Sequence, residues 1–431
     1  MKLAGAADLA ASLERRITGG ELVPGSRLEP VRAASDRLGL APNTVAAAYR
    51  SLAERGLVVA RGRLGTFVEA RLRPTSESIP EVPPGLVDLA SGEPDPALLP
   101  DLAPILAALD GSTATYGDPS VNPGLEAAAR QIMAAEGVES RLLAVTGGAV
   151  DGIERALGAW LRPGDAVAVE DPGWFAIADL VRAMGLVPVP VAIDSHGIVP
   201  DRLVQVLGRV GAVVLTPRAQ NPTGAWRSPS RAAELTEVLA ARPEVLVIED
   251  DHIGPMAGPP LAVIGPGMER WAYIRSFSKS LGPDLRTAVV TGDDTTLDQL
   301  LCRQMVGPGW VSHILQRAVA GLLDSPTVVA GQEKATVAYA ERRRFLADAL
   351  DGNGLPVGGD SGLNLWVPVD DEEAAVRAVR ERGYAIRAGS RFRHRSRPGV
   401  RVTISQIDER QAGEVAEALA GPPARRMSRA V

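Results

Sequence analysis

The spacing of apolar residues at the start of the chain predicts three helices followed by a β-hairpin. Apolar residues recur every four positions over residues 9–17, which places them on one face of a helix that ends at a glycine pair. The pattern predicts a second helix over Val31–Leu38 and a third over residues 41–56. Two short β runs, at residues 57–60 and 66–68, enclose a turn rich in arginine and glycine.

From residue 86 onward, runs of apolar and often β-branched residues alternate with stretches that are mostly long enough to hold a helix. The strand candidates are residues 166–170, 212–216, 245–249, 273–276 and 287–291. Alternation of this kind predicts an α/β fold with a mainly parallel sheet, in which ligands bind at the ends of the strands.

The segment between these two parts has a different composition. Residues 71–85 are rich in proline, serine and charge and show no apolar period, which is typical of a semi-extended linker. We therefore expect a small domain over residues 1–70 and a large domain over residues 86–422, joined by this flexible linker. The last residues, 421–431, are expected to be disordered.

Composition narrows the class of protein. With 431 residues, 45% hydrophobic and 23% charged, the chain is typical of a globular protein of two or three domains. Its single cysteine, Cys302, excludes an intramolecular disulfide framework, and we expect it to be a small buried apolar side chain. No stretch approaches the roughly 18 apolar residues of a membrane span, and the N-terminus does not resemble a signal peptide. We expect a cytoplasmic protein with no membrane partner and no metal site.

Charge is distributed unevenly between the two parts. The first 73 residues carry 12 basic and 7 acidic side chains, whereas the remainder carries 34 basic and 45 acidic ones. A basic segment suits nucleic acid, although the excess also fits a solvated surface. Three helices followed by a hairpin form a winged helix-turn-helix, and residues 21–68 resemble the DNA-binding domain of GntR-family regulators along their whole length. In such domains the third helix enters the major groove and the wing follows the minor groove or backbone.

The resemblance to GntR-family domains implies which residues contact DNA. Groove or phosphate contacts are implied for Arg32, Asn43, Thr44 and Arg50, and wing contacts for Arg61, Arg63 and Thr66. Ala41 and Pro42 stand where the family often has serine and arginine, which removes one arginine that could read a base and makes the operator less predictable. A degenerate helix-turn-helix used only for association stays open as an alternative.

A lysine in the second part is the first candidate for chemistry. Only three lysines, Lys2, Lys279 and Lys334, occur among the 46 basic residues, and Lys279 lies between two serines. Where a chain otherwise uses arginine for positive charge, a retained lysine suggests chemistry that arginine cannot perform, namely deprotonation and attack on a carbonyl. The sequence therefore indicates a Schiff base at Lys279.

Six motifs surround this lysine in a characteristic order. They are TGGAV (146–150), EDPGW (170–174), QNPTG (220–224), IEDDH (248–252), SFSKSLGPDLR (276–286) and VRVTIS (400–405). Together they resemble fold type I pyridoxal 5'-phosphate (PLP) enzymes of the aspartate aminotransferase superfamily, over nearly all of residues 86–420. The resemblance implies an aminotransferase-like α/β domain with PLP as its cofactor.

The resemblance implies a role for each residue around the cofactor ring. Lys279 would form the Schiff base, Asp250 would pair with the pyridine nitrogen, and Asn221 would donate to the phenolic oxygen O3′. Trp174 stands where the family stacks an aromatic side chain on the ring, although it can also be a core residue. Asp251, the neighbour of Asp250, stays open as the alternative ring partner.

Further residues are implied for the phosphate and the substrate. The phosphate would be bound by Gly147, Gly148, Ala149, Ser276, Ser278 and Arg286. Arg401 matches the arginine that binds the substrate carboxylate, with a surface salt bridge as the alternative. Tyr116 resembles the tyrosine that reaches the phosphate of the neighbouring subunit, and a loop anchor is an equal alternative. His252 occupies a place near O3′ where tyrosine is common, unless its side chain points elsewhere.

A GntR-type winged helix, a linker and an aminotransferase-like domain form the architecture of the MocR group of bacterial regulators. This resemblance implies a homodimer, head-to-tail, that binds a double-stranded DNA operator and senses PLP or a small amino compound as an aldimine at Lys279. A catalytically active aminotransferase that carries a DNA-binding domain is the alternative, and a sensor of PLP alone is another. The effector, the operator and the direction of regulation are not predicted.

Overall fold

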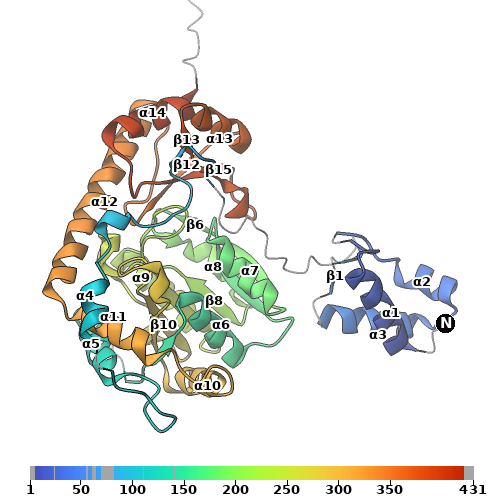
Figure 1. Cartoon of the computed structure of the whole chain (residues 1–431). Helices are drawn as coiled ribbons and strands as arrows, with labels where there is room; N and C mark the ends of the chain where they lie inside the picture. The colour runs from blue at the N-terminus through green and yellow to red at the C-terminus, as the bar shows by residue number, and fades with distance from the viewer. Residues whose placement is uncertain are drawn as a thin grey trace, which may run out of the picture. The chain divides into compact units, whose positions relative to one another are not determined.

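The computed structural model divides into two compact units (Figure 1). One is built mainly from the N-terminal residues and the other from most of the remainder, and each is described by itself. The structure describes residues 5–23, 25–54, 57–60, 65–68, 82–109, 111–138 and 141–421.

The small unit consists of three helices and a two-stranded hairpin. The helices are α1 (Ala6–Thr18), α2 (Val31–Leu38) and α3 (Pro42–Glu54), and the antiparallel strands are β1 (Val58–Ala60) and β2 (Thr66–Val68). The pattern of apolar residues therefore predicts this unit correctly, with boundaries that differ by one to three residues where they differ.

Apolar side chains from all parts of the small unit meet in one core. Leu9 of α1, Leu52 of α3 and Val68 of β2 are buried together. Gly39 ends α2 with a left-handed backbone (φ 66°), a conformation that glycine adopts without strain. The Tyr49 hydroxyl donates to the carbonyl of Glu29 at 2.9 Å and so ties α3 to the segment before α2.

An eight-stranded sheet forms the centre of the large unit, in the order β4-β11-β10-β9-β8-β5-β6-β7. Strands β5, β8, β9 and β10 are parallel neighbours, whereas β11 runs antiparallel to both β10 and β4. The prediction of a mainly parallel sheet is confirmed. The strands are β4 (Ala144–Thr146), β5 (Ala166–Asp171), β6 (Val187–Asp194), β7 (Gly197–Ile198), β8 (Ala212–Leu215), β9 (Leu246–Asp251), β10 (Trp271–Ser276) and β11 (Ala288–Gly292).

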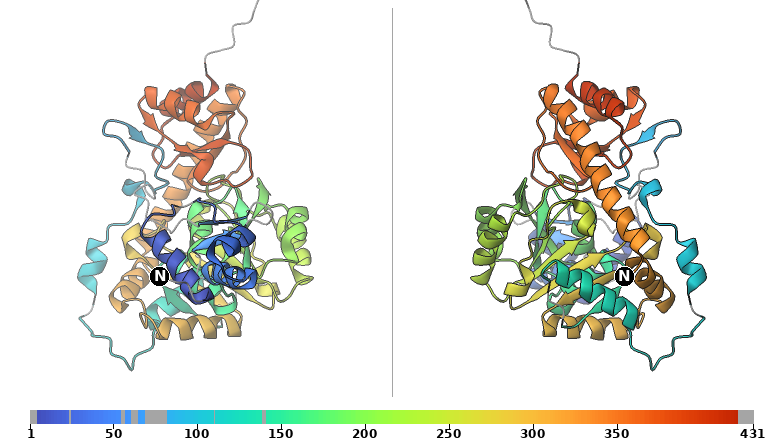
Figure 2. Two further views of the ribbon diagram at one scale, coloured as in Figure 1. Left: turned by 90° about the vertical axis from the view of Figure 1, so that its right-hand side faces the viewer. Right: turned by 90° about the vertical axis from the view of Figure 1, so that its left-hand side faces the viewer.

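Helices surround this sheet (Figure 2). Because both faces are covered, β5, β8 and β9 begin as continuous apolar runs rather than alternating ones, and all four residues of β8 are buried. The helices are α4 (Ala103–Ala108), α5 (Pro123–Ala135), α6 (Ala149–Trp160), α7 (Phe175–Ala183), α8 (Pro200–Leu207), α9 (Pro229–Ala240), α10 (Asp294–Met305) and α11 (His313–Leu323). Cys302 on α10 is exposed, so the expectation of a buried side chain is wrong.

A second layer follows the long helix α12 (Pro326–Gly352) and lies at the top of Figure 1 in orange and red. It contains α13 (Glu372–Glu381), α14 (Glu409–Ala420) and an antiparallel sheet of β12 (Asn364–Pro368), β15 (Gly399–Thr403) and β14 (Arg387–Ala388). Strand β3 (Val87–Asp88) pairs with β13 (Tyr384–Ala385) and brings residues 87–95 into this layer. No described helix is long and apolar enough to cross a membrane.

Candidate functional site

Lys279 lies in the turn that follows β10. Its Nζ donates to the carbonyl of Gly92 at 3.0 Å and forms an ion pair with Glu93 at 3.2 Å. The side chain is only 24% exposed. Burial lowers the pKa of this amine, and the charge of Arg401 lowers it further, whereas Glu93 opposes both. A lysine in such surroundings gives up its proton more readily than an exposed one and can act as a nucleophile.

Two adjacent carboxylates end strand β9 in different environments. Asp250 is 4% exposed, and its Oδ1 has no hydrogen-bond partner among the described residues. Burial raises the pKa of Asp250 to about 7, with smaller contributions from the charges of Asp251 and Glu170. Such a carboxyl group suits a bound cation, which would provide the missing partner.

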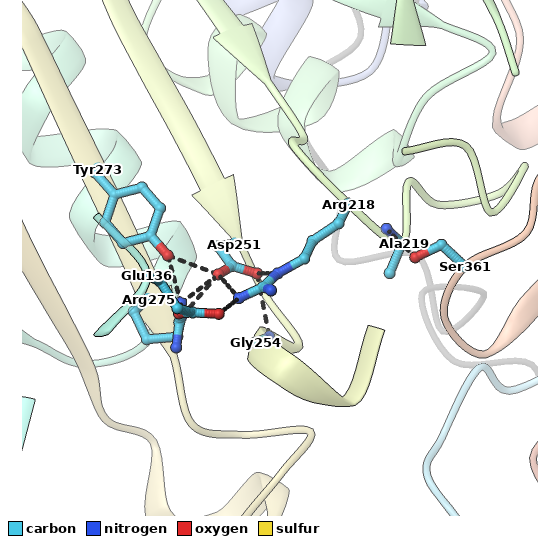
Figure 3. A network of polar contacts seen from close by, with 8 residues as sticks. All are labelled: Glu136, Arg218, Ala219, Asp251, Gly254, Tyr273, Arg275 and Ser361. Carbon is cyan, nitrogen blue, oxygen red and sulfur yellow. Dashed lines mark hydrogen bonds and ion pairs between the residues drawn. The ribbon is translucent and has the colours of Figure 1, made fainter. Parts of the chain in front are cut away.

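Asp251 lies within a buried network of charges (Figure 3). It accepts from Arg218 Nε and Nη2 at 3.1 and 2.8 Å, from Arg275 Nε at 2.8 Å and from the Tyr273 hydroxyl at 2.6 Å. Both arginines also pair with Glu136, just after α5. Although burial acts to raise the pKa of Asp251, the two guanidinium groups hold it far below its usual value.

These two environments differ in a way that concerns the choice between Asp250 and Asp251 as the partner of the pyridine nitrogen. The oxygens of Asp251 are occupied by arginine and tyrosine, whereas one oxygen of Asp250 is not. Successive residues of a strand point to opposite faces of the sheet, so the two carboxylates cannot share one ligand. The geometry favours Asp250 over Asp251 as the partner of a ligand cation.

His252 follows these carboxylates and is partly buried. Burial lowers its pKa to about 4, and the charges of Lys279 and Arg218 act in the same direction. The imidazole is therefore neutral at neutral pH, with one nitrogen that donates and one that accepts. The charge of Asp251 acts against this shift, and the direction in which the His252 side chain faces stays a prediction.

The first turn of α6 has the form of an anion site. Strand β4 ends at Thr146, Gly148 has a φ of 103°, and the helix begins at Ala149. Arg286 Nη2 donates to the carbonyl of Gly147 at 3.3 Å, and a Cβ at Gly148 would lie 3.0 Å from the same nitrogen. The unpaired N–H groups of a helix start, together with an arginine, suit a phosphate.

One predicted phosphate donor is already engaged. The N–H of Gly147 donates to Asp151 Oδ2 at 2.8 Å, so only Gly148 and Ala149 remain as predicted backbone donors. Ser276 ends β10 and accepts from the N–H of Ser278 at 3.3 Å. The hydroxyl of Ser278 is buried and has no partner among the described residues.

Arg401 lies in the interior rather than in a surface salt bridge. It is 4% exposed, its Nη1 donates to Asn221 Oδ1 at 3.1 Å, and its Nη2 donates to the carbonyl of Ala90. A Cβ at Gly92 would lie 3.1 Å from Nη1, so Arg401 and Lys279 both approach Gly92 closely. Its Nε is buried without a partner among the described residues, which leaves a donor for a ligand.

The two predicted aromatic residues differ in exposure. Trp174 is partly buried, just before α7, with its ring edge-on to Phe175 at 6.4 Å between centroids. Tyr116 is 96% exposed and lies edge-on to Trp310 at 5.6 Å. A stacking role for Trp174 and a role for Tyr116 in a neighbouring subunit stay predictions.

The predicted DNA contacts lie on the outer face of the small unit. Arg32, Asn43 and Arg50 are exposed, whereas Thr44 and Thr66 are partly exposed. The opposite face of α3 is buried in the core. Arg61 and Arg63 lie outside the described residues.

Sequence reasoning missed Glu93 and Arg387, which both lie beside the predicted site. Glu93 belongs to the polar turn SGEPD (91–95), directly after β3, and this glycine turn after a strand was a usable signal. Arg387 lies opposite Arg401 in the pairing of β14 with β15. No local pattern indicates that pairing.

Comparisons with known proteins agree with this geometry. Residues 84–419 match the family described as aminotransferase class I and II, and residues 6–68 match the gntR family of bacterial regulatory proteins. The chain is 39% identical over 411 residues to the vitamin B6 salvage pathway transcriptional repressor PtsJ of Salmonella typhimurium, covering 94% of this chain and 95% of that protein. It is 28% identical over 411 residues to the pyridoxine biosynthesis transcriptional regulator PdxR of Corynebacterium glutamicum, covering 89% and 88%.

Solved structures share the fold of the large unit. LysN, an α-aminoadipate aminotransferase from Thermus thermophilus complexed with N-(5'-phosphopyridoxyl)-L-leucine, superposes with a TM-score of 0.68 over 78% of this chain and 92% of its own, at 22% identity. Kynurenine aminotransferase from Pyrococcus horikoshii gives 0.69 over 78% and 90%, at 21% identity. At these identities the likeness shows the fold alone.

Proposed function

The chain belongs to the class I and II aminotransferase family and to the transcriptional regulators that join such a domain to a GntR-type domain, and we propose that it senses PLP, or an amino compound that reacts with PLP, at Lys279. Occupancy of that site would change its affinity for a DNA operator. The observation that carries the proposal is the Asp250 oxygen that has no partner among the described residues, in the same unit as the partly buried amine of Lys279.

The donors present fit the parts of PLP. When bound, PLP supplies an aldehyde that reacts with amines and a ring that accepts electrons. Lys279 would attack the aldehyde, and Asp250 would hold a proton at the ring nitrogen. The phosphate would be bound by the start of α6, by Arg286 and by the Ser278 hydroxyl, which has no partner among the described residues.

DNA binding would follow from the small unit. Arg32, Asn43 and Arg50 are exposed and Thr44 is partly exposed, as a recognition helix and its flanking helix require, and a DNA-binding protein of this kind would work in the cytoplasm. In such a regulator the two sites are coupled if two conformations differ both in effector affinity and in operator affinity.

We infer that the protein acts as a head-to-tail homodimer. Tyr116, Val306 and Ile314 are exposed apolar or aromatic side chains, and Trp310 packs on Tyr116. Val306 is 89% exposed, which is unusual for a large apolar side chain unless a partner covers it. Dimerisation through the large unit would bring two small units to one operator.

Turnover as an aminotransferase is the second candidate. The lowered pKa of Lys279 suits a group that moves a proton on a bound amino acid. Arg401 Nε, which has no partner among the described residues, would bind the carboxylate of that amino acid. Full-length protein loaded with PLP would then convert amino acids faster than free PLP does at the same concentration.

The test uses the full-length protein, incubated with PLP and freed of excess cofactor. Wild type should retain a visible absorbance band, Lys279→Ala should lose it, and the exposed control Lys334→Ala should keep it. Arg32→Ala and Thr44→Ala should weaken binding to genomic fragments that the wild type selects, without changing the band. A band that survives Lys279→Ala would refute the site, and DNA affinity that is equal with and without PLP would refute the sensing role.

A further inference from the structure

Ala219, two residues before Asn221, has a backbone conformation that alanine rarely adopts. Its φ is 56°, in the left-handed region, and the residue is 3% exposed. A residue other than glycine is strained in this region and stays there only where the surrounding structure fixes it. Because strained residues of this kind gather at functional sites, the contacts that hold Ala219 indicate what its conformation is for.

The left-handed turn separates two residues with different partners. Arg218, directly before Ala219, is 1% exposed and pairs with Asp251 in the charged network. Asn221 accepts from Arg401 Nη1 at 3.1 Å through its Oδ1, so its amide NH2 group is the end that can donate to a ligand. The conformation of Ala219 therefore sets the direction of the chain between the charged network and Asn221.

Ser361 holds the strained peptide from a distant part of the chain (Figure 3). It lies 142 positions after Ala219, and its hydroxyl accepts from the N–H of Ala219 at 3.0 Å. The same hydroxyl donates to the carbonyl of Ala257 at 3.0 Å, and Ser361 is 1% exposed. Loss of this hydroxyl would leave the buried N–H of Ala219 without this partner, which is costly in the interior.

Packing around the neighbouring glycine restricts Ala219 further. A Cβ at Gly362 would lie 2.4 Å from the Cβ of Ala219, so the two segments are in close contact. The N–H of Ser361 donates to the carbonyl of Gly224 at 3.0 Å, on the other side of the turn that contains Asn221. The buried Arg343 of α12 donates to the carbonyls of Ser361 and Gly362 and fixes their position. Residues 361–362 thus brace both ends of this turn.

We propose that Ser361 is a positioning residue, which holds the strained Ala219 so that Asn221 meets the phenolic oxygen O3′ of PLP. Ser361 itself would not touch the cofactor. Without its hydroxyl, the peptide of Ala219 would relax from the left-handed region and Asn221 would lose its direction. This assignment rests on the proposed function, because it names a residue that tunes the same site.

The experiment is a double-mutant cycle on the PLP-loaded full-length protein. The pH midpoint of the visible band is measured, because a donor to O3′ favours the deprotonated form of the bound cofactor and lowers that midpoint. Asn221→Ala should raise the midpoint by about 1–2 units, as expected for a lost hydrogen bond to a charged oxygen. Ser361→Ala should raise it by about half a unit or more in wild type and leave it unchanged in Asn221→Ala protein.

Two further variants distinguish positioning from stability. Thr291→Val removes a hydroxyl on β11 that is also buried and donates to the carbonyl of Leu142 at 3.0 Å. It should lower the melting temperature, as Ser361→Ala does, but leave the midpoint of the visible band unchanged. Ser361→Cys keeps the size of the side chain and weakens its acceptor, so it should raise the midpoint without loss of the fold.

Three results would overturn the proposal. They are a midpoint that neither Ser361 variant changes, an additive effect of Ser361→Ala in Asn221→Ala protein, and a shift in Thr291→Val equal to that in Ser361→Ala. Failure of the proposed function is recognised separately, because wild type would then show no visible band that Lys279→Ala removes.

Discussion

In the cofactor-free protein, the stability of Asp250→Asn relative to wild type should be greater at alkaline pH than at acidic pH. Burial raises the pKa of Asp250 from 3.8 to about 7. The folded state therefore ionises this group later than the unfolded chain does, so stability is lost as the pH rises from about 4 to about 7. At about 1.4 kcal/mol per pKa unit, the full penalty is on the order of 4 kcal/mol, and about 3 kcal/mol of it develops between pH 5 and pH 8.5.

Urea unfolding of the cofactor-free proteins at these two pH values measures the effect. Asparagine brings its own cost of about 1–3 kcal/mol for a buried amide, but that cost does not depend on pH. We therefore compare the free energy of unfolding of Asp250→Asn with that of wild type at each pH. The test is whether this difference changes between pH 5 and pH 8.5. If this difference is the same at pH 5 and pH 8.5, the carboxyl group is not neutralised by burial and the reasoning is wrong.

Asp251, the adjacent carboxylate, provides a control because its pKa is shifted in the opposite direction. Two guanidinium groups hold the pKa of Asp251 low, so this group is ionised at both pH values. Asp251→Asn should destabilise the protein by about 3–5 kcal/mol at pH 5, because it leaves buried arginine charge without its partner. The cost should be smaller at pH 8.5, where loss of the Asp251 charge also makes ionisation of Asp250 easier. With PLP bound, the proposed ring cation would reverse the effect of Asp250→Asn, which should then lower cofactor affinity in equilibrium dialysis.

Two further predictions concern the amine and the small unit. Glu93→Gln removes the ion pair that raises the pKa of Lys279, so a larger fraction of the amine is unprotonated at neutral pH. PLP uptake, followed by stopped-flow absorbance, should therefore be several-fold faster at pH 7. An uptake rate equal to that of wild type across pH 6–8 would contradict this role. Leu52→Ala, in the buried core of the small unit, should cost about 2–5 kcal/mol, so DNA binding should be lost on warming at a temperature where PLP absorbance is retained. Parallel loss of both signals would show that the two units do not unfold independently.

The sequence predicted those features of the fold that local pattern encodes. Strand β8 and the first four residues of β5 are runs of apolar residues because both faces of the sheet are covered, and a run of that kind is visible without a partner strand. The helices of the small unit show the four-residue spacing that one buried face requires. The order of the motifs then placed polar residues at the strand ends.

Features that depend on pairing between distant segments were not predicted. Glu93 reaches Lys279 because β3 pairs with β13, nearly 300 positions further along the chain. Arg387 faces Arg401 because two short strands pair in one particular register, and a shift of one residue would turn Arg387 to the other face of the sheet. The glycine turn marks Glu93 as a candidate, but no residue next to Glu93 or Arg387 indicates which distant residue it meets.

The two adjacent aspartates at the end of β9 show the same limit. Asp250 and Asp251 are chemically identical, so their order alone could not decide which one meets a ligand. Pairing with β10 separates them, because Asp251 lies opposite Arg275 and Asp250 lies opposite Ile274. The strand alternation therefore supplies Asp251 with an arginine from β10 and places Ile274 opposite Asp250. The charge that Arg218 and Arg275 keep on Asp251 helps to raise the pKa of Asp250, so the network prepares its neighbour for a cation without contacting the ligand.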